Sequence, residues 1–162
     1  MAMFVFKGLD EYVLRLSKLE KMTKEVAGKA IYAGADVMAD AIRKNIDSIP
    51  VVDFRKRGSS DSLLRGITSL QKKGLQDGFG ITPMKEENGF YNVKIGFDGY
   101  NKVKSDKHPA GQPNQMIARA VESGTTFRAK HPFVSPAVKA TKAVAEQEMA
   151  AVLNEEIEKI ME

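Results

Sequence analysis

Apolar residues recur at helical spacing over almost the whole first third of the chain, from Leu9 to Ile46, and the pattern stops at Pro50. A regular run of this length usually contains a break, which we place near residues 21–23. The sequence therefore predicts a short first helix and a long second helix that ends at about Asp47. Small residues allow another helix or a sheet to approach the second helix closely; they are Ala27, Ala30, Ala33, Gly34, Ala35, Ala39 and Ala41.

The clearest helix start lies near the C-terminal end. Ser135 is typical of an N-cap, and Pro136 is typical of the first helical position, where the missing N–H of proline costs nothing. A helix from Pro136 to Met161 is about 39 Å long, more than is needed to cover a small sheet. Two interpretations stay open: part of this helix meets a neighbouring subunit, or the helix bends around its own core.

Short strands are predicted in the middle of the chain. Residues 78–82 and 90–97 have the composition of strands, and Glu87-Asn88-Gly89 between them is a turn signal, so we expect a β-hairpin. Residues 63–70 are expected to form a short helical turn, and residues 117–121 a further short element.

Two long stretches, at about 51–62 and 98–115, contain glycine, proline and many polar residues and are predicted to be loops. Loops of this length are usually functional or disordered. Helices thus precede and follow a block of strands, an order that favours an α+β fold over an alternating parallel-sheet fold. The length of 162 residues and the absence of repeats indicate one domain, 1–162.

Composition narrows the class of protein. The chain has no cysteine, which excludes disulfides, thiolate metal sites and cysteine nucleophiles. Its hydrophobic content of 43% and charged content of 28% are those of an ordinary folded protein. The first residues lack the basic region and the long apolar run of a signal peptide, and no apolar run approaches the ~20 residues of a membrane span. Folding in a cytoplasm is therefore expected.

The sequence contains no pattern that predicts catalysis. The two histidines, His108 and His131, lie in polar loop sequence next to proline, and no serine nucleophile motif accompanies them. The segment Gly78-Phe79-Gly80 lacks the rest of a phosphate-binding loop. The carboxylate pairs Glu86-Glu87 and Glu155-Glu156 are better explained as solvent-exposed charges than as a general acid and base. We therefore predict no enzyme activity and no catalytic, cofactor-binding or metal-binding residue.

Charge is distributed unevenly along the chain, whose net charge is +4. Residues 55–73 hold six basic side chains and one acidic one, and residues 146–162 hold six acidic side chains and one basic one. The basic side chains of the two predicted loops can bind a phosphate backbone without sequence specificity, or they can simply solubilise the loops. These candidate contacts are Arg55, Lys56, Arg57, Lys102, Lys104 and Lys107. A non-specific DNA-binding module that uses Arg55 to Arg57 is the alternative function.

Short motifs in the C-terminal third resemble a known family. Val121-Glu122-Ser123-Gly124-Thr125 is followed after a short gap by Pro132-Phe133-Val134-Ser135-Pro136-Ala137. Together they resemble the signature of the tail-completion or head–tail joining (neck) proteins of tailed phages, typified by the tenth gene product of a lambdoid phage. Three further segments match the family in order: Phe6-Lys7-Gly8-Leu9-Asp10-Glu11, Pro50-Val51-Val52-Asp53 and Leu64-Arg65-Gly66-Ile67. The chain departs from the family pattern at Ser123, where an aromatic residue is usual, and at residues 54–61, which resemble an insertion.

The resemblance implies a virion protein that acts by binding. It implies helices packed on a curved antiparallel sheet, and a homo-oligomeric ring, expected to be a hexamer, at the neck or upper tail. The expected partners are a tail terminator or tail tube protein on one side and a head connector or stopper protein on the other, with DNA in the lumen. The motif residues are expected to be structural; they are Glu122, Gly124, Thr125, Pro132, Phe133 and Pro136. Basic and acidic regions can pair between neighbouring subunits, or basic residues can line the DNA channel; the sequence leaves both open.

Overall fold

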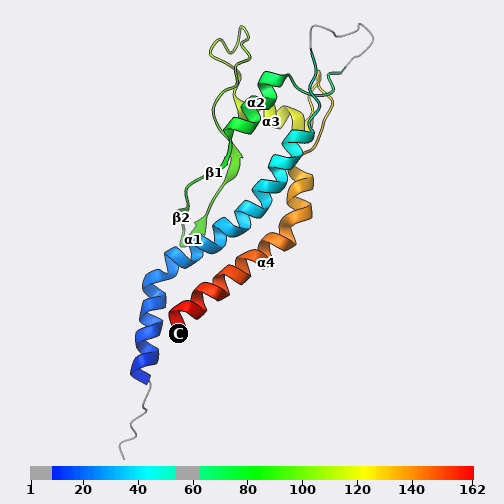
Figure 1. Cartoon of the computed structure of the whole chain (residues 1–162). Coiled ribbons are helices and arrows are strands. Elements are labelled where there is room, and N and C mark those ends of the chain that lie inside the picture. The colour runs from blue at the N-terminus through cyan, green and yellow to red at the C-terminus, as the bar shows by residue number, and fades with distance from the viewer. Residues whose placement is uncertain (1–8, 54–62) are drawn as a thin grey trace, which may run out of the picture.

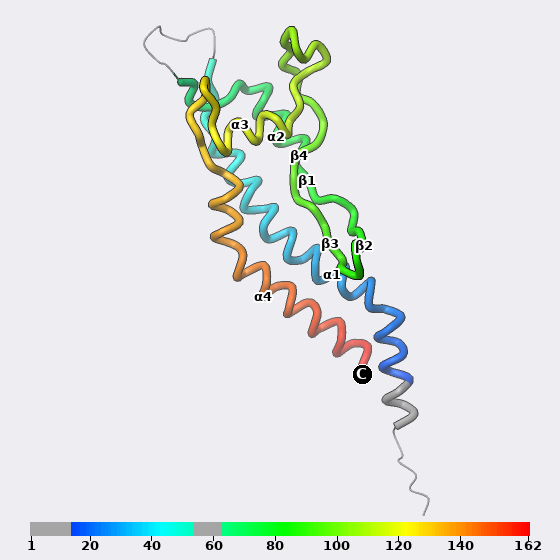
Figure 2. Tube along the Cα trace, turned by 180° about the vertical axis from the view of Figure 1, so that it is seen from behind, coloured from blue at the N-terminus to red at the C-terminus, as the bar shows by residue number. Residues whose placement is uncertain are grey.

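The computed structural model describes residues 9–53 and 63–162 of the chain. These residues form four helices and four short strands, so the predicted α+β class is confirmed at this coarse level. The molecule is elongated. A long helix runs along its middle, with the last helix on one side and the strands on the other, as Figure 1 and Figure 2 show from opposite sides.

The first helix, α1 (Leu9–Ser48), is continuous over 40 residues, so the predicted break near residues 21–23 is wrong. That segment contains neither glycine nor proline. The Thr23 hydroxyl donates to the Leu19 carbonyl at 3.0 Å, so this polar side chain is satisfied without interrupting the helix. The Arg15 guanidinium donates to a carbonyl at the end of the C-terminal helix, which ties the first turns of α1 to the rest of the molecule.

Helix α4 (Val134–Met161) lies antiparallel to α1. At Gly34 the two helices approach so closely that a Cβ atom would lie 3.2 Å from the Ala145 carbonyl oxygen. Farther along, the Lys29 ammonium lies 2.6 Å from the Glu156 carboxylate. The predicted role of small residues in close packing is therefore confirmed at Gly34, and the neighbour that it admits is a helix.

The strands form one long, interrupted hairpin. Strand β1 (Phe79–Ile81) pairs antiparallel with β4 (Ile95–Phe97), and β2 (Lys85–Glu87) pairs antiparallel with β3 (Phe90–Asn92). The turn residues Asn88-Gly89 have φ angles of 54° and 79°, as a two-residue type I′ turn requires. The predicted hairpin and its turn are confirmed.

The described strands make two two-stranded sheets, and α4 packs chiefly against α1. The expectation of two N-terminal helices is corrected to one. In Figure 2 the β1–β4 ladder lies nearer the C-terminal end of α1, and β2 and β3 extend beside the middle of α1. A two-stranded hairpin is only marginally stable alone, so packing on α1 holds this one in place.

The hydrophobic core lies at one end of the molecule, where α1 meets α2 (Ser69–Gly78), α3 (Asn114–Ser123) and the start of α4. Helix α2 begins after Thr68, so a helical turn at residues 63–70 is wrong, whereas the element predicted at 117–121 is confirmed as part of α3. The largest core side chains are Ile42, Ile46, Ile49, Ile67, Leu75, Phe79, Ile117, Val121 and Phe133.

Candidate functional site

The C-terminal motif residues singled out from the sequence meet at the junction of α3 and α4. The Glu122 carboxylate, near the end of α3, accepts hydrogen bonds from the backbone N–H groups of Phe133 (2.8 Å), Val134 (2.9 Å) and Ser135 (2.9 Å). It also accepts the Ser135 hydroxyl at 2.6 Å. A carboxylate at the positive end of a helix dipole stabilises that helix. Glu122 therefore acts as the cap of α4 from outside the helix.

This arrangement corrects the predicted start of α4. The helix begins at Val134, two residues before the predicted Pro136, and Ser135 lies inside its first turn instead of at the N-cap. The observed N-cap residue, Phe133, makes no capping hydrogen bond with its side chain. Because Glu122 satisfies the first N–H groups and Pro136 has none, the first turn of α4 needs no serine cap.

Burial raises the pKa of the Glu122 carboxyl, but hydrogen bonds from Ser135, Val134 and Phe133 act in the opposite direction and together lower the pKa below its ordinary value. The carboxylate form is therefore the one that the fold favours. This is a structural role, because Glu122 has all its hydrogen bonds within the scaffold.

Gly124 and Thr125 make a tight turn after α3. Gly124 has a φ of 75°, and a Cβ there would lie 3.0 Å from the Lys130 nitrogen, so glycine is required. Thr125 and Arg128 exchange backbone hydrogen bonds of 2.9 and 3.3 Å. Arg128 is buried, its guanidinium donates to the Gly66 carbonyl, and burial lowers its pKa.

Pro132 and Phe133 lead from that turn into α4. The Phe133 side chain is 1% exposed, and its ring meets that of Phe97 edge-on with centroids 5.9 Å apart. The Asn45 side chain of α1 donates to the Phe133 carbonyl at 2.9 Å. Phe133 therefore joins α1, β4 and α4, as expected for an anchor in the core.

The candidate basic contacts divide into two groups. Arg55, Lys56 and Arg57 lie outside the described residues. The other three lie on residues 99–113, which we call the basic arm; they are Lys102, Lys104 and Lys107, and all three are exposed. The predicted loop at 98–115 is thus confirmed, except that its last two residues begin α3. In Figure 1 and Figure 2 the basic arm projects at the end of the molecule opposite the end of α4.

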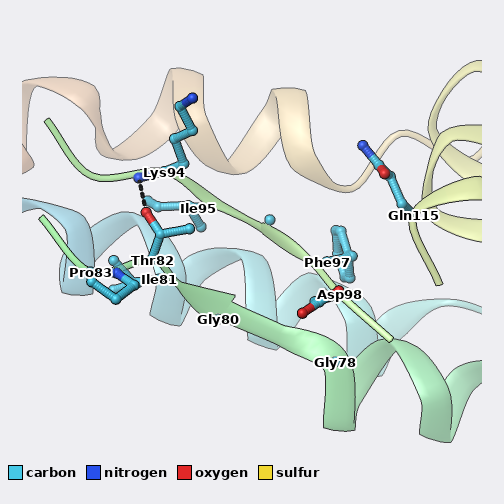
Figure 3. Close-up of a pocket in the computed structure, with 11 residues that line it drawn as sticks. Gly78, Gly80, Ile81, Thr82, Pro83, Lys94, Ile95, Phe97, Asp98 and Gln115 are labelled. Atoms are coloured by element: carbon cyan, nitrogen blue, oxygen red, sulfur yellow. Dashed lines mark hydrogen bonds between the residues drawn. The ribbon is translucent and has the colours of Figure 1, made fainter. Parts of the chain in front are cut away.

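A groove of about 580 Å³ runs along the β1–β4 ladder (Figure 3). Gly80 and Gly96 are directly paired there, and a Cβ on either one would meet no atom within 4 Å. Figure 3 shows Thr82 and Lys94 at one end, joined by the hydrogen bond from the Lys94 N–H to the Thr82 hydroxyl (2.8 Å), and Gln115 of α3 at the other. Its middle is lined by glycine backbone and by Ile81, Ile95 and Phe97, and the polar side chains Thr82, Lys94, Asp98 and Gln115 lie toward its ends.

Within the described ranges, no group of three or more histidine, aspartate or glutamate residues is arranged to hold a metal ion. His108 lies on the basic arm, where it exchanges backbone hydrogen bonds with Ser105, and His131 lies between α3 and α4. Glu86 and Glu87 are exposed on β2. Glu155 and Glu156 both lie near Lys159, in ion pairs of 2.6 and 3.0 Å.

Neither the groove nor the capping role of Glu122 was predicted from the sequence. The groove depends on the pairing of Gly80 with Gly96, which follows from the hairpin register once the Asn88-Gly89 turn is fixed. The Glu122 cap joins residues 11 to 13 positions apart, and no local capping pattern describes such a contact.

No protein-family model matches the chain, and neither the curated proteins nor the solved structures include a match. Across residues 9–53 and 63–162, no helix has the length and apolar character needed to cross a membrane.

Proposed function

We propose that this chain is a structural protein of a tailed-phage virion that completes the tail or joins it to the head. The observation that carries the proposal is the α3–α4 junction. Its Glu122, Gly124 and Phe133 belong to the motif that resembles the neck family, and in the structure they serve as a helix cap, a turn and a core anchor. These are roles in building a scaffold, which support a protein that acts by binding and carries out no reaction.

An apolar surface on α4 supports assembly into a ring. Ala137 and Ala145 face the interior, while Val144 is 52% exposed and Leu153 is 39% exposed. Exposed alanines lie among them: Ala140, Ala143, Ala150 and Ala151. A helix with apolar residues on more than one side is suited to packing on more than one neighbour. We assign the outer side of α4 to contact with the next copy, in a head-to-tail interface that closes into a hexameric ring.

The curved sheet implied by the family resemblance belongs to this ring. Among residues 9–53 and 63–162, each strand of the two ladders pairs with one other strand, and the free edge of a strand can pair with another chain. In the proposed assembly, ladders of neighbouring copies lie side by side and together form a curved antiparallel sheet.

The ring is placed at the neck or upper tail. One face would bind the tail terminator or tail tube protein, and the other the head connector or stopper protein, with DNA passing through the lumen. The chain would be made in the host cytoplasm and incorporated during assembly as a single domain.

The test is removal of the coding sequence from the phage genome that carries it, followed by electron microscopy of the particles produced. Unjoined heads and tails, restored to complete particles by the wild-type chain supplied in trans, are expected. An A143E/A150E variant should fail to restore them, because these exposed alanines lie seven residues apart on one side of α4 and two charges would enter the contact. The matched control S69E/T126E adds the same two charges at exposed sites away from α4 and should restore assembly. Normal particles after deletion would refute the proposal.

A further inference from the structure

The basic arm (residues 99–113) is an ordered projection. The Asn101 N–H donates to the Gln112 carbonyl at 2.9 Å, and the Gln112 N–H donates to the Val103 carbonyl at 3.0 Å. At the tip, Ser105 and His108 exchange backbone hydrogen bonds of 3.2 and 2.9 Å. The arm is therefore two antiparallel segments closed by a two-residue turn.

The base of the arm is tied to the core. The Gln71 side chain of α2 donates to the Gln112 side chain at 2.7 Å. Gly111 has a φ of 122°, and a Cβ there would lie 2.1 Å from the Asn101 carbonyl oxygen, so the two segments approach as closely as glycine allows. An arm held in this way loses little conformational entropy when it binds a partner.

Exposure alternates along the first segment of the arm. Tyr100, Lys102 and Lys104 are exposed, whereas Asn101 is buried and Val103 is half-buried. Successive side chains of an extended segment point to opposite sides, so two lysines and a 68%-exposed tyrosine share one outward side. Lys107 adds a third ammonium group at the tip.

Among the described residues, these lysines are not engaged with carboxylates, unlike the lysines of the ion pairs on the helices. Lys29, Lys73 and Lys159 each form an ion pair with a carboxylate. In the part of the chain that the structure describes, Lys102, Lys104 and Lys107 form none. Their only acidic neighbour in the turn is Asp106, so the arm presents an excess of positive charge to solvent.

We propose that the basic arm binds the phosphate backbone of duplex DNA without reading its sequence. A narrow two-stranded projection fits a groove of the duplex, whose width admits a two-stranded ribbon, and ammonium groups at its surface then replace the counterions of the flanking phosphates. The acidic end of α4 in another copy is a weaker match, since part of its charge is already paired with Lys29 and Lys159.

This inference deepens the proposed function by naming the partner of one surface, and it rests on that function only for the place of the DNA. Its test uses the purified chain alone. If the purified chain does not bind DNA, the proposed ring assembly still stands. If deletion of the gene leaves particles normal, the proposed DNA binding still stands.

The test measures the affinity of the full chain for a fluorescent random-sequence duplex at a series of salt concentrations. The wild-type affinity should fall steeply with salt. In K102Q/K104Q/K107Q the slope of log affinity against log salt should be smaller by about 2 to 3, close to one unit for each lost phosphate contact. The gain-of-charge variant D106K should make the slope steeper.

The matched control is K18Q/K85Q/K139Q, which removes the same charge from exposed lysines on three other elements and should keep the wild-type slope. Absence of wild-type binding at low salt would overturn the proposal. So would equal slopes for the arm variant and the wild type, or equal losses in the arm variant and the control. If the arm variant instead altered only self-association, the partner would be a second copy and the proposal would be wrong.

Discussion

The Glu122 carboxylate accepts both the backbone N–H (2.9 Å) and the hydroxyl (2.6 Å) of Ser135, so a side chain of α3 stabilises the first turn of α4. Further bonds from Phe133 and Val134 fix the same carboxylate. Because α4 in turn packs along α1, this contact fixes the α3–α4 junction at one end of the longest helix pair.

Loss of the cap should destabilise the fold. In Glu122→Ala, the N–H groups at the start of α4 lose their acceptor, and we expect the free energy of unfolding to fall by about 1–2 kcal/mol, as for other helix caps. Urea unfolding followed by circular dichroism measures this value. Glu148→Ala is the matched control, because Glu148 is exposed on α4; equal effects of the two substitutions would contradict the capping role.

The contribution of Glu122 should depend on pH. The pKa of this carboxyl is lower in the folded chain than the ordinary value of 4.5, because the hydrogen bonds from Ser135, Val134 and Phe133 outweigh the opposing effect of burial. Its stabilisation is therefore complete above the pKa of the unfolded chain and is lost as the pH falls through the folded pKa. The stability difference between the wild type and Glu122→Gln should be constant near neutral pH and shrink below about pH 4.5. A difference that stays unchanged in acid would show that the carboxylate charge is irrelevant.

Gly74 should not tolerate a side chain. A Cβ at this position of α2 would lie 2.4 Å from the Asn101 Cβ and 3.1 Å from the Asn101 Cα, at the base of the basic arm. Gly74→Ala should therefore lower the free energy of unfolding by about 1–3 kcal/mol, the usual cost of overpacking. The same change at Gly80, where a Cβ meets nothing within 4 Å, should have little effect. Thermal unfolding of both variants tests the difference, and an equally stable Gly74→Ala would be inconsistent with this packing.

The two phenylalanines near the α3–α4 junction should differ sharply in importance. Phe133 is 1% exposed and Phe127 is 70% exposed. Phe133→Ala should cost about 3–5 kcal/mol through the cavity that it leaves, and Phe127→Ala should cost almost nothing. Chemical unfolding of the two variants gives the comparison; similar losses would mean that Phe133 is not the core anchor.

Local patterns predicted much of the fold. The Asn88-Gly89 turn with its flanking strands is confirmed, as is the close packing allowed at Gly34. The capping box of α2 was overlooked: the Thr68 hydroxyl accepts from the Gln71 N–H and the Gln71 side chain accepts from the Thr68 N–H, both at 3.1 Å. Its Thr-x-x-Gln spacing is a recognised start signal and by itself predicts a helix that begins at Ser69.

The remaining errors come from contacts between residues distant in sequence. Helix α4 begins at Val134 because Glu122 of α3 lies beside it, a contact that no local pattern describes. In the candidate site, too, some features follow from local sequence and others from contacts between distant residues. Alternation along the basic arm follows from Tyr100, Lys102 and Lys104 themselves, whereas its anchoring through Gln71 and Gln112 depends on the tertiary fold.

The central claim is that copies of this chain form a ring between the head and the tail of a phage. The most direct measurement is a cryo-electron microscopy reconstruction of the neck of the virion. The account predicts a closed ring in which each copy is recognised by its antiparallel α1–α4 pair, with the outer side of α4 against the next copy. A neck reconstruction at side-chain detail that contains no copy of this chain would contradict it.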